Sequence, residues 1–246
     1  MSRPELIERA TYTPALPVEE FIVPLLLSRI APILESLPAS EGRVLDVGCG
    51  RQPFRHLFET RGYTYVSTDA QNPLGIVDVV AEIDKDLPAA LLARGPFDFI
   101  LCTEVLEHVA DWHKVFANFS LLLKSGARLL VTCPHFYILH EAPYDFWRPT
   151  TYALLYHSEK FGLRCVSIEA AGGSWEILGT IVAANLDSAR AIVRTPFNRI
   201  LGFTVDRLTR ATFRLLKSRF FQQRVAWGSD RYPIYLSNVA LFEKRI

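Results

Sequence analysis

Two hydrophobic patterns alternate along most of the chain. Short runs that are apolar at successive positions are typical of strands buried on both faces, and longer segments with apolar residues every three or four positions are typical of amphipathic helices. Strands are predicted at 43–48, 63–69, 77–83, 97–106, 127–134, 164–171 and 232–244, and helices at 54–62, 89–95, 111–126 and 150–163. This alternation predicts a doubly wound α/β fold with a mostly parallel, seven-stranded sheet.

The beginning of the chain follows a different pattern. Five prolines punctuate an apolar segment there: Pro14, Pro17, Pro24, Pro32 and Pro38. Because proline interrupts helices, we expect a broken, N-terminal helical cap over residues 1–40. Residues 41–246 are expected to form one domain, with a basic helical insertion at about 173–231 before the last strand. A chain of 246 residues is long enough for one sizeable core and short for two.

Charge is unevenly distributed, although the formal net charge is only +1. Residues 190–231 hold ten basic residues against two acids, so the rest of the chain is acidic. Four of the basic residues are spaced to share one helical face: Arg207, Arg210, Arg214 and Lys217. Such a helix fits a solvated basic face, an anionic membrane surface, a lid over a ligand pocket or a dimer contact. We do not expect nucleic acid as a partner, because the segment lacks a pattern of interleaved glycines and exposed-looking aromatic residues and the rest of the chain is acidic.

The cysteines and the apolar runs bear on the compartment. Cys49, Cys102, Cys133 and Cys165 lie in or beside apolar runs without paired metal-ligand spacing, as free thiols do in a reducing cytoplasm. No apolar stretch reaches the roughly 18 residues that span a bilayer, and the first residues lack the apolar core of a signal peptide. We therefore expect a cytoplasmic protein, with attachment to a membrane surface as an open alternative, and metal-independent chemistry.

The stretch RVLDVGCG, residues 43–50, predicts a strand that enters a tight turn at Gly48 and Gly50. Glycines let such a turn adopt positive φ and let a ligand approach the backbone closely. Asp69 ends the next predicted strand, where a carboxylate can accept both hydroxyls of a ribose. These features together favour a cofactor that contains a nucleoside.

A nicotinamide dinucleotide is one candidate for this cofactor. The dinucleotide fingerprint has a third glycine three residues after the second, and this chain has Pro53 there. Pro53 has no N–H to offer a pyrophosphate, and Asp46 would repel a diphosphate but suits a cation. A dehydrogenase is therefore the disfavoured alternative. S-adenosylmethionine, a nucleoside with a positive charge and no phosphate, fits the same residues better.

The stretches VLDVGCG, YVSTD and FDFILCTEVLEHV, in this order and spacing, resemble the class I S-adenosylmethionine-dependent methyltransferases, in particular the branch with LDVGCG and EVLEHV. The resemblance covers about residues 41–172 and the last strand, and it implies a Rossmann-like methyltransferase fold. It implies that the glycine turn contacts the methionine part of the cofactor, that Asp69 binds the ribose, and that other residues contact the adenine and the methyl donor. The expected cofactor-binding residues are Asp46, Gly48, Cys49, Gly50, Asp69, Ala70, Glu82, Ile83, Thr103 and Glu104.

Two features depart from the pattern of that family. Gln52 stands where relatives usually have a small residue. The stretch AEIDKDLP also leaves Glu82, Ile83 and Asp84 as competing candidates for the adenine contacts. Neither departure changes the predicted cofactor, but both leave open which residues contact it.

The stretch CPHFYILHEAPYDFWRPT, residues 133–150, gathers histidines, acids and aromatic residues after the fifth predicted strand. Methyl transfer to a hydroxyl needs positioning and usually a general base. His140 or His135 is the expected base, although each histidine also has an ordinary structural interpretation. The expected substrate-binding residues are His108, Tyr144, Asp145 and Arg148.

The sequence therefore predicts an S-adenosylmethionine-dependent methyltransferase, expected to O-methylate a small molecule, lipid or saccharide precursor as a monomer or homodimer. The alternative is a non-catalytic relative that binds the cofactor and acts through a partner. Intact Asp46, Gly48, Gly50 and Asp69 argue against that alternative. The sequence does not specify the acceptor or the atom that is methylated.

Overall fold

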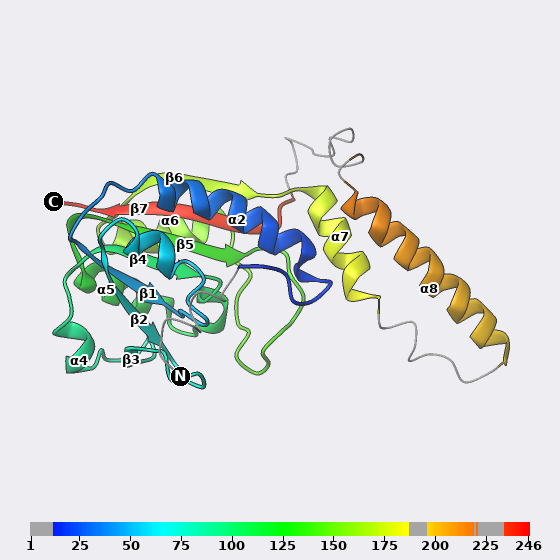
Figure 1. Cartoon of the computed structure of the whole chain (residues 1–246), viewed down its shortest axis with the longest axis horizontal. Coiled ribbons are helices and arrows are strands. Elements are labelled where there is room, and N and C mark those ends of the chain that lie inside the picture. Colours follow the sequence, from blue (N-terminus) through cyan, green and yellow to red (C-terminus); the bar gives the residue numbers. More distant parts are fainter. Residues whose placement is uncertain (1–11, 187–195, 219, 221–233) are drawn as a thin grey trace.

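The computed structural model describes residues 12–186, 196–218, 220 and 234–246. Its centre is a seven-stranded sheet in the order β3-β2-β1-β4-β5-β7-β6 (Figure 1). The strands are β1 (Arg43–Val47), β2 (Thr64–Asp69), β3 (Val79–Val80), β4 (Phe97–Thr103), β5 (Leu123–Pro134), β6 (Leu163–Ala171) and β7 (Ser237–Lys244). β7 runs antiparallel to β5 and β6, and the other pairs are parallel. The predicted doubly wound, mostly parallel sheet is confirmed.

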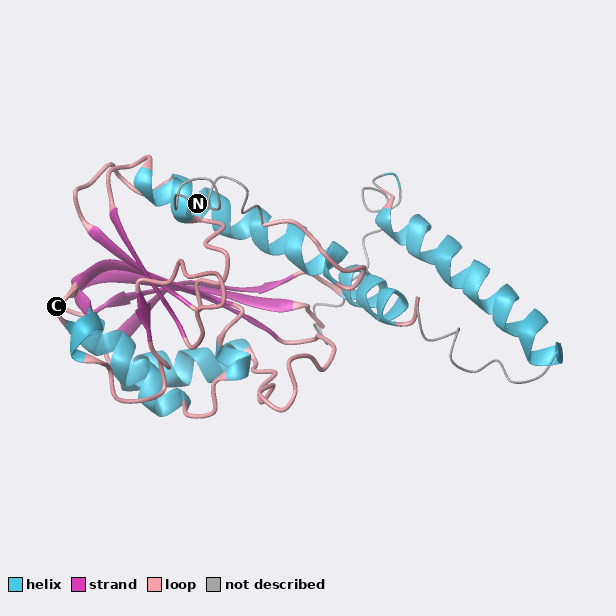
Figure 2. Cartoon of the chain, turned by 60° about the horizontal axis from the view of Figure 1, so that its bottom comes forward, coloured by secondary structure: helices cyan, strands magenta, loops and turns pink. Residues whose placement is uncertain are grey.

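Helices cover both faces of this sheet, as the view of Figure 2 shows. They are α2 (Glu19–Glu35), α3 (Arg55–Glu59), α4 (Ala89–Leu92), α5 (Trp112–Leu122), α6 (Thr151–Lys160), α7 (Ser174–Ala184) and α8 (Pro196–Lys217), with a 3-10 turn, η1, at Leu106–His108. Successive strand residues point to opposite faces. In β1, Leu45 joins the core beneath α5 and α6, while Val44 joins the core beneath α2, α3 and α7.

The first helix differs from the prediction. Residues 19–35 form one continuous helix through Pro24 and Pro32, so the expectation of a broken helix is wrong there. Each proline removes one backbone N–H, but the helix buries Leu26, Ile30 and Leu34 completely against the sheet. Tertiary packing of this apolar face outweighs two missing hydrogen bonds. The division between a cap at 1–40 and a domain at 41–246 stays a prediction.

Two predicted boundaries also shift near the carboxyl ends of β4 and α5. The helix expected to reach Gly126 ends at Leu122, because buried Leu123 already pairs with Phe97 of β4. The strand expected to reach Leu106 ends at Thr103, because Glu104 turns the chain at a φ of +53°. Because the strand ends at Thr103, the residues after it belong to the loop that contributes to the site described below.

The insertion between β6 and β7 is helical where the structure describes it. α7 lies beside the sheet, and α8 projects beyond it (Figure 1). The Trp175 indole N–H donates to the Leu216 carbonyl at 2.9 Å, and Lys217 Nζ lies 2.7 Å from Glu20 Oε1 of α2. Residues 187–195, 219 and 221–231 of the predicted basic segment, and residues 232 and 233 of the last predicted strand, lie outside the described part. Within that part, no helix is long and apolar enough to cross a bilayer.

Candidate functional site

A cleft of about 900 Å³ lies at the carboxyl ends of β1, β2 and β4. Parallel sheets bind ligands at this edge, because the loops that follow neighbouring strands meet there. Seven of the ten residues expected to bind a cofactor line it: Gly48, Gly50, Asp69, Ala70, Glu82, Ile83 and Glu104. Of the residues expected to bind the acceptor, His108 and Tyr144 line the same cleft.

The turn after β1 requires glycine for two different reasons. Gly48 has a φ of +65°, and a Cβ there would lie 2.2 Å from Cγ2 of Val105. Gly50 has a φ of +48°, and nothing lies within 4 Å of the position of its missing Cβ. Gly48 is therefore fixed by packing, whereas Gly50 leaves open space on the cleft wall that a ligand can fill.

Asp69 is held at the end of β2 by the same turn. The Gly50 N–H donates to Asp69 Oδ2 at 3.0 Å, and the Gln71 N–H donates to Oδ1 at 3.2 Å. A carboxylate oxygen has two lone pairs, so each oxygen can still accept a ligand hydroxyl. The carboxylate is thus fixed in position and retains two acceptor sites toward the cleft.

Three of the expected cofactor residues do not line the cleft. Asp46 is buried beneath the turn, where it accepts a hydrogen bond from the Tyr65 hydroxyl, and burial raises its pKa to about 7. Cys49 is also buried, and its pKa is raised to about 12 for the same reason. Thr103 lies at the end of β4 and outside the cleft wall. Asp46 therefore supports the turn from below instead of facing a ligand.

The loop after β3 is braced by a residue that sequence reasoning missed. Asn118, on the buried face of α5, donates to the carbonyls of Ile83 at 2.7 Å and Lys85 at 2.8 Å. Glu82, Ile83 and Asp84 all line the cleft, so the one-residue ambiguity there remains. A polar residue on the apolar side of a predicted helix was the available signal for Asn118.

The contacts of Gln52 explain how a large residue fits where relatives usually have a small one. Its backbone has a φ of +60°, and its buried side chain donates to the Ile76 carbonyl at 2.9 Å. The side chain therefore ties the turn after β1 to the loop between β2 and β3. Within the described structure it does not line the cleft, so it takes no room from a ligand.

The charge of the cleft fits S-adenosylmethionine. Carboxylates outnumber basic side chains among the described residues of its wall: the acids are Asp69, Glu82, Asp84, Glu104 and Glu141, against Arg51 and His108. Apolar side chains such as Ile76 and Ile83 offer a surface for an aromatic base. An acidic, partly apolar cleft attracts a cationic nucleoside and disfavours a diphosphate.

Two carboxylates lie between the cleft and the core. Glu104 donates its backbone N–H to Thr132 Oγ1 at 3.2 Å, and burial raises the pKa of its side chain to about 7. Glu107 in η1 is fully buried, and neither of its carboxylate oxygens has a hydrogen-bond partner in the described structure. Burial and the nearby Glu104 raise the pKa of Glu107 well above its usual range.

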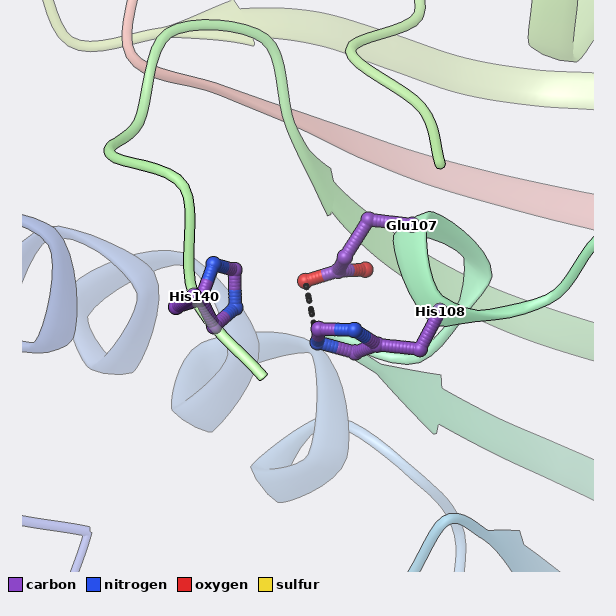
Figure 3. Close-up of side chains that lie close together, drawn as sticks. All are labelled: Glu107, His108 and His140. Carbon is purple, nitrogen blue, oxygen red and sulfur yellow. Dashed lines mark ion pairs between the residues drawn. The ribbon is translucent and has the colours of Figure 1, made fainter. Parts of the chain in front are cut away.

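Two histidines face Glu107 from different segments (Figure 3). His108 Nε2 lies 3.8 Å from Glu107 Oε1 and 3.9 Å from Glu141 Oε2. The rings of His108 and His140 meet edge to face, with centroids 4.7 Å apart. His108 Nδ1 lies 2.8 Å from the Tyr144 carbonyl oxygen. We call Glu107, His108 and His140 the histidine centre.

The loop that carries His140 is held by an ion pair. Arg148 donates to both oxygens of Asp145, at 2.6 and 2.8 Å, and this contact lowers the pKa of Asp145 to about 2. Asp145 also accepts the backbone N–H of His140 at 2.9 Å. The backbone N–H groups of Phe146 and Trp147 donate to the Glu107 carbonyl. Asp145 and Arg148, expected to bind substrate, thus brace the loop outside the cleft wall.

His135, the other expected base, lies elsewhere. Its ring stacks on Tyr235 at a centroid distance of 4.1 Å, and its Nδ1 lies 2.9 Å from the Pro149 carbonyl oxygen. It is not among the described residues that line the cleft. The structure therefore brings His140 and His108 together and leaves His135 in a packing position.

Comparison with known protein families identifies the family of this chain. Residues 19–164, more than half of the chain, match the family described as Methyltransferase domain. The chain belongs to this family. Its membership confirms the predicted class I methyltransferase domain and S-adenosylmethionine as the cofactor of the family.

Curated relatives of this methyltransferase domain share part of its length. A ubiquinone biosynthesis O-methyltransferase of Xylella fastidiosa (strain 9a5c) is 35% identical over 116 residues, which cover 42% of this chain and 46% of that protein. The protein of the same name from Paraburkholderia phymatum is 35% identical over 94 residues, which cover 34% of this chain and 40% of the relative. The chain thus spans under half the length of these relatives.

Solved structures resemble the fold over nearly the whole chain. An S-adenosylmethionine-dependent methyltransferase from Archaeoglobus fulgidus has a TM-score of 0.54 at 18% identity, and covers 92% of this chain and 94% of its own. The [4+2]-cyclase SpnF has a TM-score of 0.52 at 14% identity, and covers 96% and 99%. Likenesses at these identities show the fold alone, so the reaction has to be argued from the site.

Proposed function

We propose that this protein transfers a methyl group from S-adenosylmethionine to a hydroxyl oxygen of a small molecule, a lipid or a saccharide precursor. The observation that carries the proposal is the histidine centre, Glu107, His108 and His140, which meets the cleft at His108. S-adenosylmethionine supplies a methyl group activated by its sulfonium. What remains for this chain is to bind the two reactants, align them and handle the proton of the acceptor.

The cofactor half of the cleft is built for binding. Asp69 is to accept the ribose hydroxyls, since both of its oxygens retain an acceptor site there. Gly50 lets the ligand lie against the backbone, and the acidic wall favours its positive charges. Ile83 offers an apolar surface to the adenine.

The acceptor half is built for proton transfer. His108 is the member of the histidine centre that lines the cleft, and Glu104 lines it next to η1. An acceptor hydroxyl there would lie beside imidazole groups that can receive its proton, either directly or through a molecule or ion bound between them. The loop braced by Asp145 and Arg148 places Tyr144 on the cleft wall, where it helps to exclude water. The names of the curated relatives support oxygen as the methylated atom.

A methyl-release assay tests this function. Purified protein is incubated with S-adenosylmethionine and a panel of phenolic, saccharide and lipid-linked hydroxyl acceptors, and S-adenosylhomocysteine is quantified. We expect turnover with at least one acceptor, and its loss in His108→Ala but not in His113→Ala, which replaces an exposed histidine on α5. Cofactor binding without turnover by any acceptor would favour the non-catalytic alternative.

The exposed face of α8 supports a contact with an anionic membrane surface. Val205, Leu208 and Leu215 are exposed on one side of the helix, and Arg207 and Arg214 are exposed on another. A helix with this division binds at the headgroup boundary of a bilayer. Sedimentation with vesicles should recover the wild type with anionic lipid and not Leu208→Glu. Self-association in the absence of vesicles would instead assign this face to a homodimer.

A further inference from the structure

The carboxylate of Glu107 presents an electrostatic problem that the fold itself leaves open. The side chain is fully buried; in the described structure neither oxygen accepts a hydrogen bond from a nitrogen or oxygen donor, and the neighbouring Cys133 thiol is only a weak donor. Burying an unpaired carboxylate is costly, so such groups are normally protonated, paired or bound to a cation. The Arg148 guanidinium, whose charge lowers the pKa of Glu107, is committed to both oxygens of Asp145 and to the Ile138 carbonyl. Glu104, a second carboxylate, makes the environment still more negative.

The two histidines are oriented by backbone carbonyls. His108 Nδ1 lies 2.8 Å from the Tyr144 carbonyl oxygen, and His140 Nδ1 lies 3.1 Å from that of Ile138. A carbonyl oxygen can only accept, so each neutral ring carries its proton on Nδ1 and a lone pair on Nε2. Histidines that bind metals are oriented in this way, with the distal N–H donating to a carbonyl or carboxylate.

We propose that the histidine centre binds a divalent metal cation through Glu107, His108 and His140. One ligand atom from each residue lies within 4.8 Å of the others, which is close enough for a single ion to reach all three after small side-chain adjustments (Figure 3). Glu141 Oε2, 3.9 Å from His108 Nε2, offers a fourth ligand from the cleft side. One carboxylate with two imidazoles suits Zn²⁺, Mn²⁺ or Fe²⁺ better than Ca²⁺, which takes oxygen ligands.

The proposal replaces the expectation of metal-independent chemistry. That expectation rested on linear spacing, and the ligands here come from η1 and from the loop after β5. The backbone contacts of Phe146 and Trp147 with Glu107 bring these segments together. A catalytic use of the cation, in which it holds the acceptor hydroxyl and lowers its pKa, rests on the proposed function; binding of the cation does not.

Titration calorimetry of the full chain with Mn²⁺ and Zn²⁺, after removal of metals by chelation, tests the site. We expect one cation per chain for the wild type, and affinity at least ~10-fold weaker in Glu107→Gln and in His108→Ala. His113→Ala, which removes an exposed histidine outside the centre, should bind as the wild type does. Absence of binding at millimolar cation, or equal binding in the three variants, would overturn the proposal.

Thermal unfolding provides a second measurement that does not depend on catalysis. A bound cation stabilises the folded state by mass action, so Mn²⁺ should raise the Tm of the wild type and leave that of Glu107→Gln unchanged. Without cation, Glu107→Gln should be as stable as the wild type or more so, because it removes an unpaired buried charge. An equal Mn²⁺ shift in both proteins would place the cation elsewhere.

The methyl-release assay separates the two proposals. Cation binding without methyl transfer leaves the metal site standing and removes the proposed function. Methyl transfer by a chelated protein that binds no cation does the reverse, and makes the histidines direct proton acceptors. Methyl transfer that disappears on chelation and returns with Mn²⁺ supports both.

Discussion

The two halves of the cleft differ in how their polar groups are satisfied. On the half formed by β1, β2 and the loop after β3, Asp69 accepts two backbone N–H groups, and Asn118 and Gln52 brace the loops with their amides. On the half formed after β4 and β5, the two carboxylate oxygens of Glu107 have no hydrogen-bond partner in the described structure. Saturated groups preserve the shape of a binding site, whereas unsaturated groups retain the capacity to take up a proton or a cation.

The largest expected effect separates catalysis from cofactor binding. His108→Ala should lower the rate of methyl release by about 10²- to 10⁴-fold, because it removes the imidazole that faces the acceptor. Its Kd for S-adenosylmethionine, measured by calorimetry, should stay within about threefold of the wild type, since Asp69 and the glycine turn are intact. A parallel loss of cofactor affinity would mean that the two halves do not act separately.

His135 offers the matched comparison for that variant. His135→Gln removes a ring that stacks on Tyr235 outside the cleft wall. We expect a lower free energy of unfolding and a methyl-release rate within about tenfold of the wild type. A rate as low as that of His108→Ala would restore His135 as a candidate base.

The glycine turn allows a comparison within the cofactor half. Gly48→Ala places a Cβ 2.2 Å from Val105 at positive φ and should lower the free energy of unfolding by about 3 kcal/mol or more. Gly50→Ala meets no atom, so only the cost of the left-handed backbone remains, about 1–2 kcal/mol. Denaturant titration measures both. Equal losses in the two variants would contradict the packing role of Gly48. Adding Val105→Ala should recover part of the loss caused by Gly48→Ala and none of the loss caused by Gly50→Ala.

A substitution of Asn118, which lies outside the cleft wall, tests whether the hydrogen bonds that hold the loop after β3 matter for cofactor binding. Asn118→Ala removes the donors to the Ile83 and Lys85 carbonyls and should lower the free energy of unfolding by about 1–3 kcal/mol. The Kd for S-adenosylmethionine should rise by about three- to tenfold as the loop loosens, without a change in methyl-release rate at saturating cofactor. An unchanged Kd would show that this loop needs no brace to bind the cofactor.

The smallest expected effect is a pH dependence of stability from Asp46. Its pKa is about 7 in the folded state against an ordinary value of 3.8. Between about pH 4 and pH 7 the folded state therefore retains a proton that the unfolded state has lost. This contribution to stability is present at low pH and is lost as the pH rises through 7, with a slope of at most about 1.4 kcal/mol per pH unit.

Asp46→Asn should remove that slope, because the amide can still accept from the Tyr65 hydroxyl and does not ionise. The measurement is the difference in free energy of unfolding between wild type and variant from pH 4 to pH 9. Glu104 titrates in both proteins, so it largely cancels in the difference. A difference that stays constant with pH would contradict the raised pKa of Asp46.

Features that follow from the sheet could be predicted from the sequence. Asp69 ends a predicted strand rich in β-branched residues, and parallel strands end at one edge of a sheet, so its place at the same edge as the glycine turn follows from the topology. The alternation of strands and helices predicts parallel strands with helices on both faces, whereas the order of the strands became known only from the structure. The resemblance of the glycine turn and of EVLEHV to one family further supported S-adenosylmethionine as the predicted cofactor.

Features that depend on packing between distant segments could not be predicted. Pro24 and Pro32 carry a strong helix-breaking signal, which the burial of Leu26 and Ile30 overrides. Glu107 follows the fourth predicted strand in the stretch EVLEHV, but its buried environment exists only when the loop after β5 folds back onto η1. Linear spacing cannot show such a juxtaposition.

The most direct test of the account is a calorimetric titration of the wild type, Asp69→Asn and His108→Ala with S-adenosylmethionine and with NAD. The account predicts micromolar binding of S-adenosylmethionine to the wild type and to His108→Ala, and binding weaker by about 10- to 100-fold in Asp69→Asn, which loses charge-assisted hydrogen bonds. NAD should not bind. Binding of NAD, or equal affinity for S-adenosylmethionine in Asp69→Asn and the wild type, would contradict the assignment of the cleft.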